Sequence, residues 1–374
     1  MPERPAPLVL VTLPPTGQRF GTHEAIAADG QRLLAAELSR RLGRLGAAVA
    51  PLPSEPSESF HWGRWFTAAA RAVLADAEGP VDAIGYAGGG SLALLADDAL
   101  DLLLSPIAGE VITNSRFSAD AFVVAGDLDA ALTALEACRT DNAAPRRLEE
   151  AGFALRDLGA AAWTRFDVDT TLDLALLRLA TRLDGMRPVD GSVRGYLDMA
   201  RLPGDRRLEV PSLERIGEVM RDRSAELVVA GRVGGATLAE LETETACRVR
   251  AFVEERGMRS AREGAVRPRS VLAALMGRSS AAELVATLAS LGDAVVLDTR
   301  VLMAAVAGSA EARGWPPAEE RFASDFGDAA GVSTAWLREL TETAASAHIP
   351  FLFGGHALVS DGLRLIMRAA WQGR

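Results

Sequence analysis

The fold is decided by residues 81–104, which read VDAIGYA (81–87), GGGS (88–91) and LALLADDALDLLL (92–104). This pattern predicts a buried strand, a tight glycine loop and an acidic, leucine-rich helix directly after the loop. Glycines at a strand end let backbone amides approach a bulky anion that a Cβ atom would block, and a following helix adds the positive end of its dipole. The simpler alternative is a strand-to-helix turn without a ligand.

Length and charge limit the other interpretations. A chain of 374 residues is too long for one ordinary core, so two domains are expected. Its 49% hydrophobic and 24% charged residues are typical of a soluble globular protein. The net charge of −10 argues against nucleic acid or an anionic membrane as a partner, but not against a local basic pocket for one phosphate.

The two cysteines, Cys138 and Cys247, lie far apart in the sequence and form neither a metal-ligand spacing nor a disulfide framework. Residues 1–7 lack the charged start and apolar run of a signal peptide. No uninterrupted apolar stretch is long enough to span a bilayer. We therefore expect a cytoplasmic protein with buried, reduced thiols.

Strands and helices alternate through the first half of the chain. Besides the strand before the glycine loop, apolar runs predict strands at residues 8–13, 47–52, 110–113, 121–124 and 161–168. Helical spacing predicts helices at residues 25–45, 61–77 (with an aromatic start), 128–138, 144–151 and 172–183. This alternation predicts an α/β fold with a mostly parallel sheet covered on both faces.

A second domain follows a linker. Residues 186–211 are the expected linker, because they carry prolines, glycines and charges without a clean periodicity, so the domains are expected at residues 1–185 and 212–374. The second domain has predicted strands at residues 226–230, 294–297 and 350–353, and predicted helices at residues 238–256, 281–291 and 363–371. It is therefore expected to be α/β too, but more helical than the first.

Two stretches of the first domain carry a family resemblance. Residues 89–95 read GGSLALL after a buried strand, and residues 166–174 read FDVDTTLDL after another. They resemble the Gly-Asp-x-Pro-Leu-Leu and Asp-x-Asp/Asn-Thr-Pro-x-Asp-Leu motifs of nucleotidyltransferases of the molybdenum-cofactor guanylyltransferase type, which include 2-phospholactate guanylyltransferase. The resemblance covers residues 8–183. It implies a three-layer, Rossmann-like (glycosyltransferase-A-like) nucleotidyltransferase domain.

The implied activity is Mg²⁺-dependent transfer of a nucleotidyl group from a nucleoside triphosphate to a small acidic or phosphorylated metabolite. Side chains two apart on a strand share a face, so Asp167 and Asp169 are the expected metal ligands. The simpler alternative is that Asp169 only caps the following helix and Asp167 is solvated. Arg19 and Asp169 are the expected catalytic residues, with Arg19 holding a phosphate. The expected nucleotide-binding residues are Gly17, Gly88, Gly89, Gly90 and Ser91, and the expected substrate-binding residues are Asn114, Arg116 and Asp120.

Two departures from the family pattern matter. Ser91 stands where the family has a metal-binding aspartate, and a hydroxyl is a poorer Mg²⁺ ligand than a carboxylate. The first loop, LPPTGQRFG at residues 13–21, keeps two glycines and an arginine in altered register but lacks the family's lysine. The alternatives are therefore a transferase with shifted ligands, or a decayed domain that binds a nucleotide or metabolite while the second domain carries the function.

The second domain has candidates of its own, because open α/β sheets place ligands at strand ends. They are Arg232, Asp298, Arg300, Gly355 and His356, and an enzyme acting there on a sugar phosphate or nucleotide is a third alternative. The charged residues between Arg248 and Arg256 are expected on a solvated helix face. His23 and His61 are expected to be structural. No Gly-x-Ser-x-Gly motif supports a hydrolase triad, and the oligomeric state stays open, a homo-oligomer included.

Overall fold

The computed structural model describes residues 6–14, 21–53, 60–159, 163–258, 267–310, 312 and 314–372. The chain divides into two compact units. The first comprises residues 1–19, 28–169 and 187–193, and the second comprises residues 20–27, 170–186 and 194–374. Both are α/β, so the α/β prediction is confirmed.

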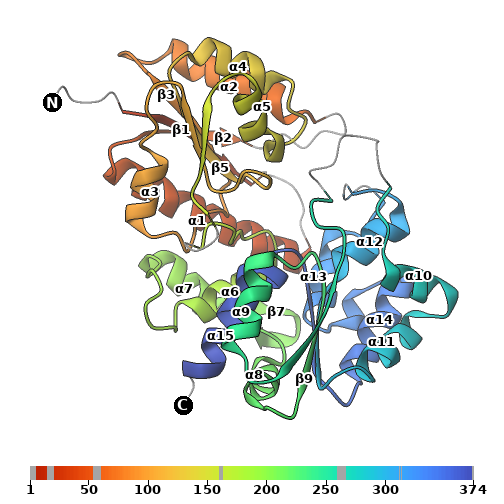
Figure 1. The fold of residues 1–374 in the computed structure, drawn as a ribbon. Helices are drawn as coiled ribbons and strands as arrows, with labels where there is room; N and C mark the ends of the chain where they lie inside the picture. The colour runs from red at the N-terminus through yellow and green to blue at the C-terminus, as the bar shows by residue number, and fades with distance from the viewer. Residues whose placement is uncertain are drawn as a thin grey trace. The chain divides into compact units, whose positions relative to one another are not determined.

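The first unit is built on a six-stranded sheet with the order β2-β1-β3-β5-β4-β6 (Figure 1). Its strands are β1 (Leu8–Leu13), β2 (Ala48–Pro53), β3 (Ala83–Ala87), β4 (Glu110–Thr113), β5 (Ala121–Ala125) and β6 (Ala154–Asp157). Only β5 runs antiparallel, to both β3 and β4, and the other pairs are parallel. The predicted mostly parallel sheet is therefore confirmed.

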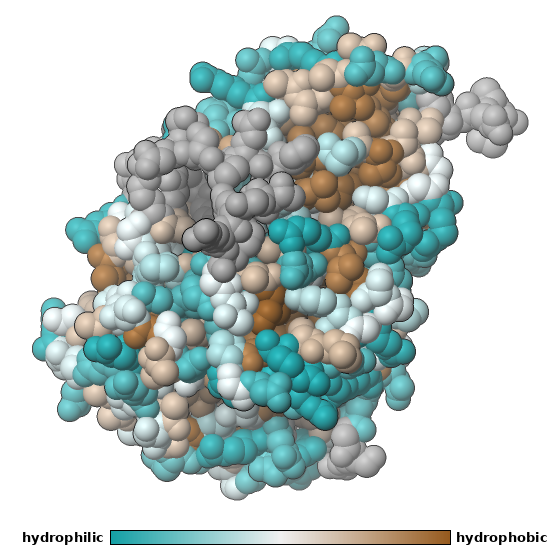
Figure 2. Space-filling view, turned by 180° about the vertical axis from the view of Figure 1, so that it is seen from behind, coloured by the Kyte–Doolittle hydropathy of each residue, from teal (hydrophilic) through white to brown (hydrophobic). Residues whose placement is uncertain are grey.

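Helices cover both faces of this sheet. The helices α2 (Trp62–Ala75), α4 (Leu128–Glu136) and α5 (Ala144–Glu150) supply one core with Phe66, Leu132 and Leu148. On the opposite face, α1 (Thr22–Arg44) and α3 (Asp97–Leu103) supply a second core with Leu38 and Leu100. Apolar residues also gather in the upper part of the view in Figure 2, where Figure 1 places this sheet and its helices.

Three predictions for the first unit are wrong in detail. The helix after the glycine loop starts only at Asp97, because residues 92–95 form turns and Leu92 has a φ of 59°. That helix therefore brings no dipole to the loop. Residues 163–168 form no strand; Asp167 makes one isolated antiparallel bridge, and residues 161 and 162 lie outside the described part. The sixth strand is instead β6, which the sequence prediction missed.

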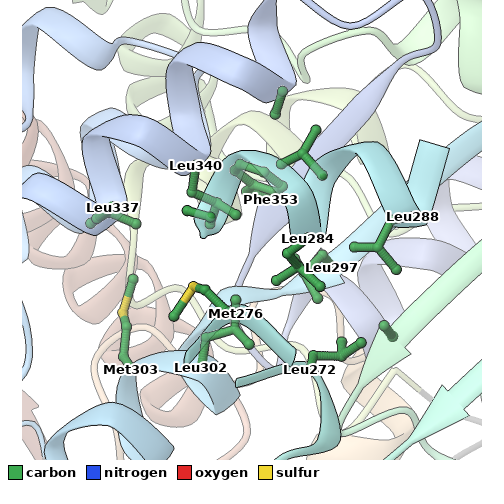
Figure 3. Close-up of a cluster of buried hydrophobic side chains, with 14 of the residues drawn as sticks. Leu272, Met276, Leu284, Leu288, Leu297, Leu302, Met303, Leu337, Leu340 and Phe353 are labelled. Carbon is green, nitrogen blue, oxygen red and sulfur yellow. The ribbon is translucent and has the colours of Figure 1, made fainter. Parts of the chain in front are cut away.

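The second unit has a parallel four-stranded sheet with the order β10-β9-β11-β12. The strands are β9 (Glu226–Gly231), β10 (Arg248–Val253), β11 (Ala294–Asp298) and β12 (Phe351–Gly354). One face is covered by a core that includes Leu284, Leu340 and Phe353 (Figure 3). The helices that supply most of it are α10 (Val271–Arg278), α11 (Ala281–Ala289), α12 (Thr299–Ala307) and α14 (Ala335–Ala345).

Other helices complete this unit. They are α6 (Thr171–Ala180), α8 (Leu213–Arg221), α9 (Gly235–Glu244), α13 (Ala318–Asp325) and α15 (Leu363–Gln372), with α8 and α9 packed against α15. The stretch 186–211 holds α7 (Gly191–Met199) and a two-stranded sheet of β7 (Arg201–Leu202) and β8 (Arg206–Arg207). In the described part of the chain, no helix combines the length and apolar character needed to cross a membrane.

The predicted helix over residues 238–256 is wrong in its second half. The helix α9 ends at Glu244, and residues 248–253 form the edge strand β10. The sequence RVRAFV has β-branched and aromatic residues that favour a strand over a helix. Arg248 and Arg250 consequently lie on a sheet edge, where both pair with Glu226 of the neighbouring strand.

Candidate functional site

The order of the first sheet defines a switch point between β1 and β3. From β1 the chain continues to β2 on one side, whereas β3 lies on the other side. Open α/β sheets bind ligands outside the carboxyl ends of the strands at such a point. A pocket of about 380 Å³ lies there, here named the switch-point pocket, and it is lined by Thr12, Leu13, Pro14, Gln31, Phe60, Trp62, Trp65, Tyr86, Gly89, Gly90, Arg139, Thr140 and Asp141.

Four aromatic residues line this pocket. Phe60 and Trp65 meet edge to face with ring centroids 5.4 Å apart, and Phe60 is 42% exposed. Trp62 and Tyr86 lie deeper, at 3% and 5% exposure, with their rings edge to face at 5.1 Å. His61 caps the helix that carries both tryptophans, since its Nδ1 accepts the Arg64 N–H at 3.4 Å. The expected structural role of His61 therefore fits its place.

Tyr86 and Asp141 form the polar part of the pocket wall. The Tyr86 hydroxyl donates to Asp141 Oδ2 at 3.2 Å, and the Asn142 N–H donates to Asp141 Oδ1 at 2.9 Å. Burial, reinforced by the nearby Asp141 carboxylate, raises the pKa of Tyr86 well above its usual value, so the hydroxyl keeps its proton. The sequence prediction missed Arg139, Thr140 and Asp141, because they follow α4 in a loop that has no recognisable motif.

At two positions of the glycine loop, residues 88–91, only glycine fits, because backbone carbonyl groups of the protein itself lie too close for a Cβ atom. A Cβ atom on Gly89 would lie 2.4 Å from the Thr12 carbonyl oxygen, and one on Gly90 would lie 2.4 Å from the Val168 carbonyl oxygen. The Gly89 N–H donates to Thr12 Oγ1 at 2.8 Å. Among the described residues, the Gly90 N–H makes no hydrogen bond, and Gly90 lines the pocket.

Two arginines fix the chain after the loop. Arg41 is 2% exposed and donates to the carbonyl oxygens of Leu92 and Leu95, at 3.1 and 2.5 Å. Arg187 donates to the Ala93 carbonyl at 3.0 Å. These hydrogen bonds satisfy carbonyl groups that a helix would otherwise have paired, which explains why residues 92–95 hold a turn conformation.

One of the two expected metal ligands, Asp167, lies beside the loop, whereas Asp169 is exposed and directly precedes Thr170, the N-cap of α6. Asp167 pairs with Ser91 in the isolated bridge, and the Val168 N–H donates to the Gly90 carbonyl at 3.2 Å. The Ser91 hydroxyl, however, donates to the Gly88 carbonyl at 2.8 Å. No group of three or more His, Cys, Asp or Glu side chains suited to a metal ion occurs in the part of the chain that the structure describes. Asp167 lies beside Ser91, whose hydroxyl is engaged within its own loop.

The expected substrate-binding residues are tied to the protein itself. The Asn114 side chain accepts the N–H groups of Asp120 and Ala121, both at 3.0 Å, and donates to the Thr164 carbonyl at 2.9 Å. Arg116 is exposed and pairs with Glu149 at 2.5 Å. None of the three expected residues is among the described residues that line the switch-point pocket. Gly17 and Arg19 lie outside the described residues.

The candidates of the second unit come together at the carboxyl ends of β9, β11 and β12. Asp298 is completely buried and receives Arg232 Nε at 2.6 Å and Nη2 at 3.1 Å. Arg300 forms a second buried bidentate pair with Asp325, at 2.5 and 2.7 Å. Gly355 and His356 follow β12, and a Cβ atom on Gly355 would lie 3.6 Å from Arg300 Nε.

These pairs shape the charges of the second unit. Burial raises the pKa of Asp298, but Arg232, His356 and Arg300 outweigh it, so the net pKa is lowered. For Asp325 burial outweighs Arg300, and the net pKa is raised. Gly231 has a φ of +116°, and a Cβ atom there would lie 2.4 Å from the Asp298 Cβ, so only glycine fits beside this pair. The residues predicted from the strand ends therefore belong to a buried network of ion pairs. The sequence analysis did not name one member of this network, Asp325.

His23 is a buried residue of the second unit. Its Nδ1 lies 3.4 Å from Thr171 Oγ1, and its Nε2 has no hydrogen-bond partner among the described residues. Glu319 accepts the backbone N–H groups of His23 and Glu24, at 3.0 and 2.9 Å, while Glu24 accepts the Glu319 N–H at 3.1 Å. The first turns of α1 and α13 thus cap each other, which agrees with the expected structural role of His23.

No protein-family model matches this chain, and no curated protein matches it.

Proposed function

We propose that the first unit binds a nucleotide, or a similar phosphorylated aromatic metabolite, in the switch-point pocket. The observation that carries the proposal is the position of this pocket at the carboxyl ends of β1 and β3. Its volume of about 380 Å³ falls in the range of small-molecule sites, which are mostly apolar with a few polar groups.

The lining suits the two chemical halves of such a ligand. The Phe60 and Trp65 rings offer faces on which a planar ring stacks, which is worth about 1–3 kcal/mol for a nucleobase. Gly90 and Arg139 line the same pocket, and a backbone amide and a guanidinium are both donors to phosphate oxygens. A local donor set of this kind is needed, because the chain as a whole carries a net charge of −10.

Binding is favoured over nucleotidyl transfer as the function. The Ser91 hydroxyl, at the position where the resembled family has a metal-binding aspartate, is engaged within its own loop. Transfer remains a second candidate on one observation, that Asp167 and the glycine loop are adjacent. We therefore regard the unit as a nucleotidyltransferase-like binding domain.

Isothermal titration with ATP, CTP, GTP and UTP tests the proposal. We expect binding by the wild-type protein and a loss of at least tenfold in affinity for Trp65→Ala, because one stacking surface is removed. Trp371→Ala, a matched change of a half-exposed tryptophan in the second unit, should bind like the wild type. Pyrophosphate release measured in parallel would instead support transfer, and absence of binding to all four nucleotides would reject the proposal.

A further inference from the structure

We propose that Asp141 makes the switch-point pocket selective for rings that carry an exocyclic amino group over rings that carry an oxo group in its place. This inference rests on the proposed function and names the substrate class of the same site. It assigns a specificity role to a residue that lies outside every motif of the sequence.

The hydrogen-bonding chemistry of the Asp141 carboxylate decides which ring edge fits beside it. Asp141 lines the pocket together with the Phe60 and Trp65 rings. An ionised carboxylate only accepts hydrogen bonds, so a ring edge that faces it must donate. An amino group donates, whereas an oxo group presents lone pairs that the carboxylate repels. An oxo ring also has a ring N–H donor, but this N–H lies one position away from the oxo group, so a ring held with its exocyclic group at the carboxylate presents lone pairs there.

The Asp141 carboxylate is held in place by two hydrogen bonds. Its Oδ2 accepts the Tyr86 hydroxyl at 3.2 Å, and its Oδ1 accepts the Asn142 N–H at 2.9 Å. Tyr86 lies on the central strand β3, between the rings of Trp62, Phe66 and Phe122. Because Tyr86 is 5% exposed and packed on these rings, Asp141 is oriented by the rigid core rather than by a mobile side chain.

Affinity and selectivity come from different residues of the pocket. Stacking on aromatic side chains tolerates every base, because every base has a π face. A carboxylate at the ring edge, in contrast, accepts a hydrogen bond from an amino group and repels an oxo group in its place. Phe60 and Trp65 therefore supply affinity without selection, and Asp141 supplies the selection.

The test compares ligands that differ by one amino-to-oxo change. Titrations use CTP against UTP and ATP against ITP, so that both ring sizes are covered. We expect the wild-type protein to bind the amino member of at least one pair about 10- to 100-fold more tightly, the usual effect of one hydrogen bond to a charged group. Asp141→Asn should bring the two members of that pair within about threefold, because a carboxamide both donates and accepts.

Two further variants separate a positioning effect from a general one. Tyr86→Phe removes the hydroxyl that orients Asp141 but keeps the ring, so the preference should shrink while the unfolding transition stays cooperative. Asp129→Asn makes the same charge change on the exposed side of α4 and should leave the preference intact. Equal binding of both members of each pair by the wild type would overturn the inference but not the proposed function. Binding of none of the four ligands would overturn the inference, and the proposed function as well if GTP does not bind either.

Discussion

Arg232 and Asp298 form a bidentate ion pair inside the second unit, with Nε and Nη2 of the arginine 2.6 and 3.1 Å from the carboxylate oxygens. The pair joins the ends of β9 and β11, and Asp298 is completely buried. Removing one partner of a buried pair leaves the other charge unpaired in a medium that solvates it poorly. The pair therefore fixes the geometry of these two strand ends.

Asp298→Ala should lower the free energy of unfolding by about 3–5 kcal/mol, measured by urea denaturation. The double variant Asp298→Leu with Arg232→Met should recover most of that loss, because it removes both charges together. The control is Asp205→Asn, because the Asp205 side chain is 92% exposed and its Oδ1 lies 3.8 Å from Arg201 Nε. This change should lower the free energy of unfolding by no more than about 1 kcal/mol. If Asp298→Ala proved as stable as the wild type, this description of the pair would be contradicted.

The same pair sets a pH dependence. Because the net pKa of Asp298 is lowered in the folded protein, its contribution to stability is complete above the unfolded pKa of about 3.9. It is lost as the pH falls through the lower folded value, where the carboxylate is protonated in both states. The unfolding free energy of the wild type should therefore fall relative to that of the double variant, which lacks this carboxylate, as the pH becomes acidic. Parallel curves from pH 7 to pH 2 would count against the pair.

His23 should destabilise the protein at mildly acidic pH. Burial lowers the pKa of His23, and Arg206 lowers it further, while Glu319 and Asp328 raise it, with burial the largest effect. The unfolded chain then takes up a proton below about pH 6.5 before the folded chain does, so stability falls by at most about 1.4 kcal/mol per pH unit. His23→Gln should flatten this slope between pH 7.5 and 5.5. The exposed His348, changed to Gln, is the control and should leave it unchanged.

Arg41 and its neighbour Arg40 offer a matched pair of variants on one helix. Arg41→Met should cost about 2–4 kcal/mol, because the Leu92 and Leu95 carbonyls lose a buried charged donor. Arg40→Met should cost at most about 1 kcal/mol, since the Arg40 side chain is 52% exposed and pairs with a surface carboxylate. Chemical denaturation measures both. Equal costs would mean that Arg41 does not hold the chain after the glycine loop.

Gly89→Ala tests why the loop needs glycine. The added Cβ would lie 2.4 Å from the Thr12 carbonyl oxygen, so the loop and β1 must separate and the protein should lose about 1–3 kcal/mol even without a ligand. Gly79→Ala meets nothing within 4 Å and should change stability little. If Gly89→Ala proved as stable as the wild type but failed to bind nucleotide, an approaching anion would explain the glycine better than the protein's own backbone.

The sequence predicted well those elements whose apolar period is clear. The strands around Leu10, Ile84, Val228 and Val296 were predicted because continuous apolar runs bounded by glycine, proline or polar residues are typical of buried parallel strands. Asp167 does lie beside the glycine loop, but through one isolated bridge to Ser91 and not at the end of the strand that the sequence predicted.

Other features depend on distant residues, and a local pattern does not contain them. The segment 92–95 has helical composition, but Arg41 and Arg187 pair its carbonyls and hold it in turns. The pocket residue Asp141 follows no motif and acquires its place through Tyr86, which lies 55 positions earlier. Residues 248–253 were predicted as a helix because their charges dominated the pattern, whereas pairing with β9 decided their structure.

The most direct test is whether the switch-point pocket binds a nucleotide without a metal ion. Calorimetry measures the affinity of the wild-type protein and of Trp65→Ala for ATP and CTP, first with EDTA and then with Mg²⁺. We predict that at least one nucleotide binds in EDTA, that Mg²⁺ changes its affinity less than tenfold, and that Trp65→Ala weakens binding at least tenfold under both conditions. Binding only with Mg²⁺, unaffected by Trp65→Ala and accompanied by pyrophosphate release, would contradict it and place the function at Asp167 and Asp169.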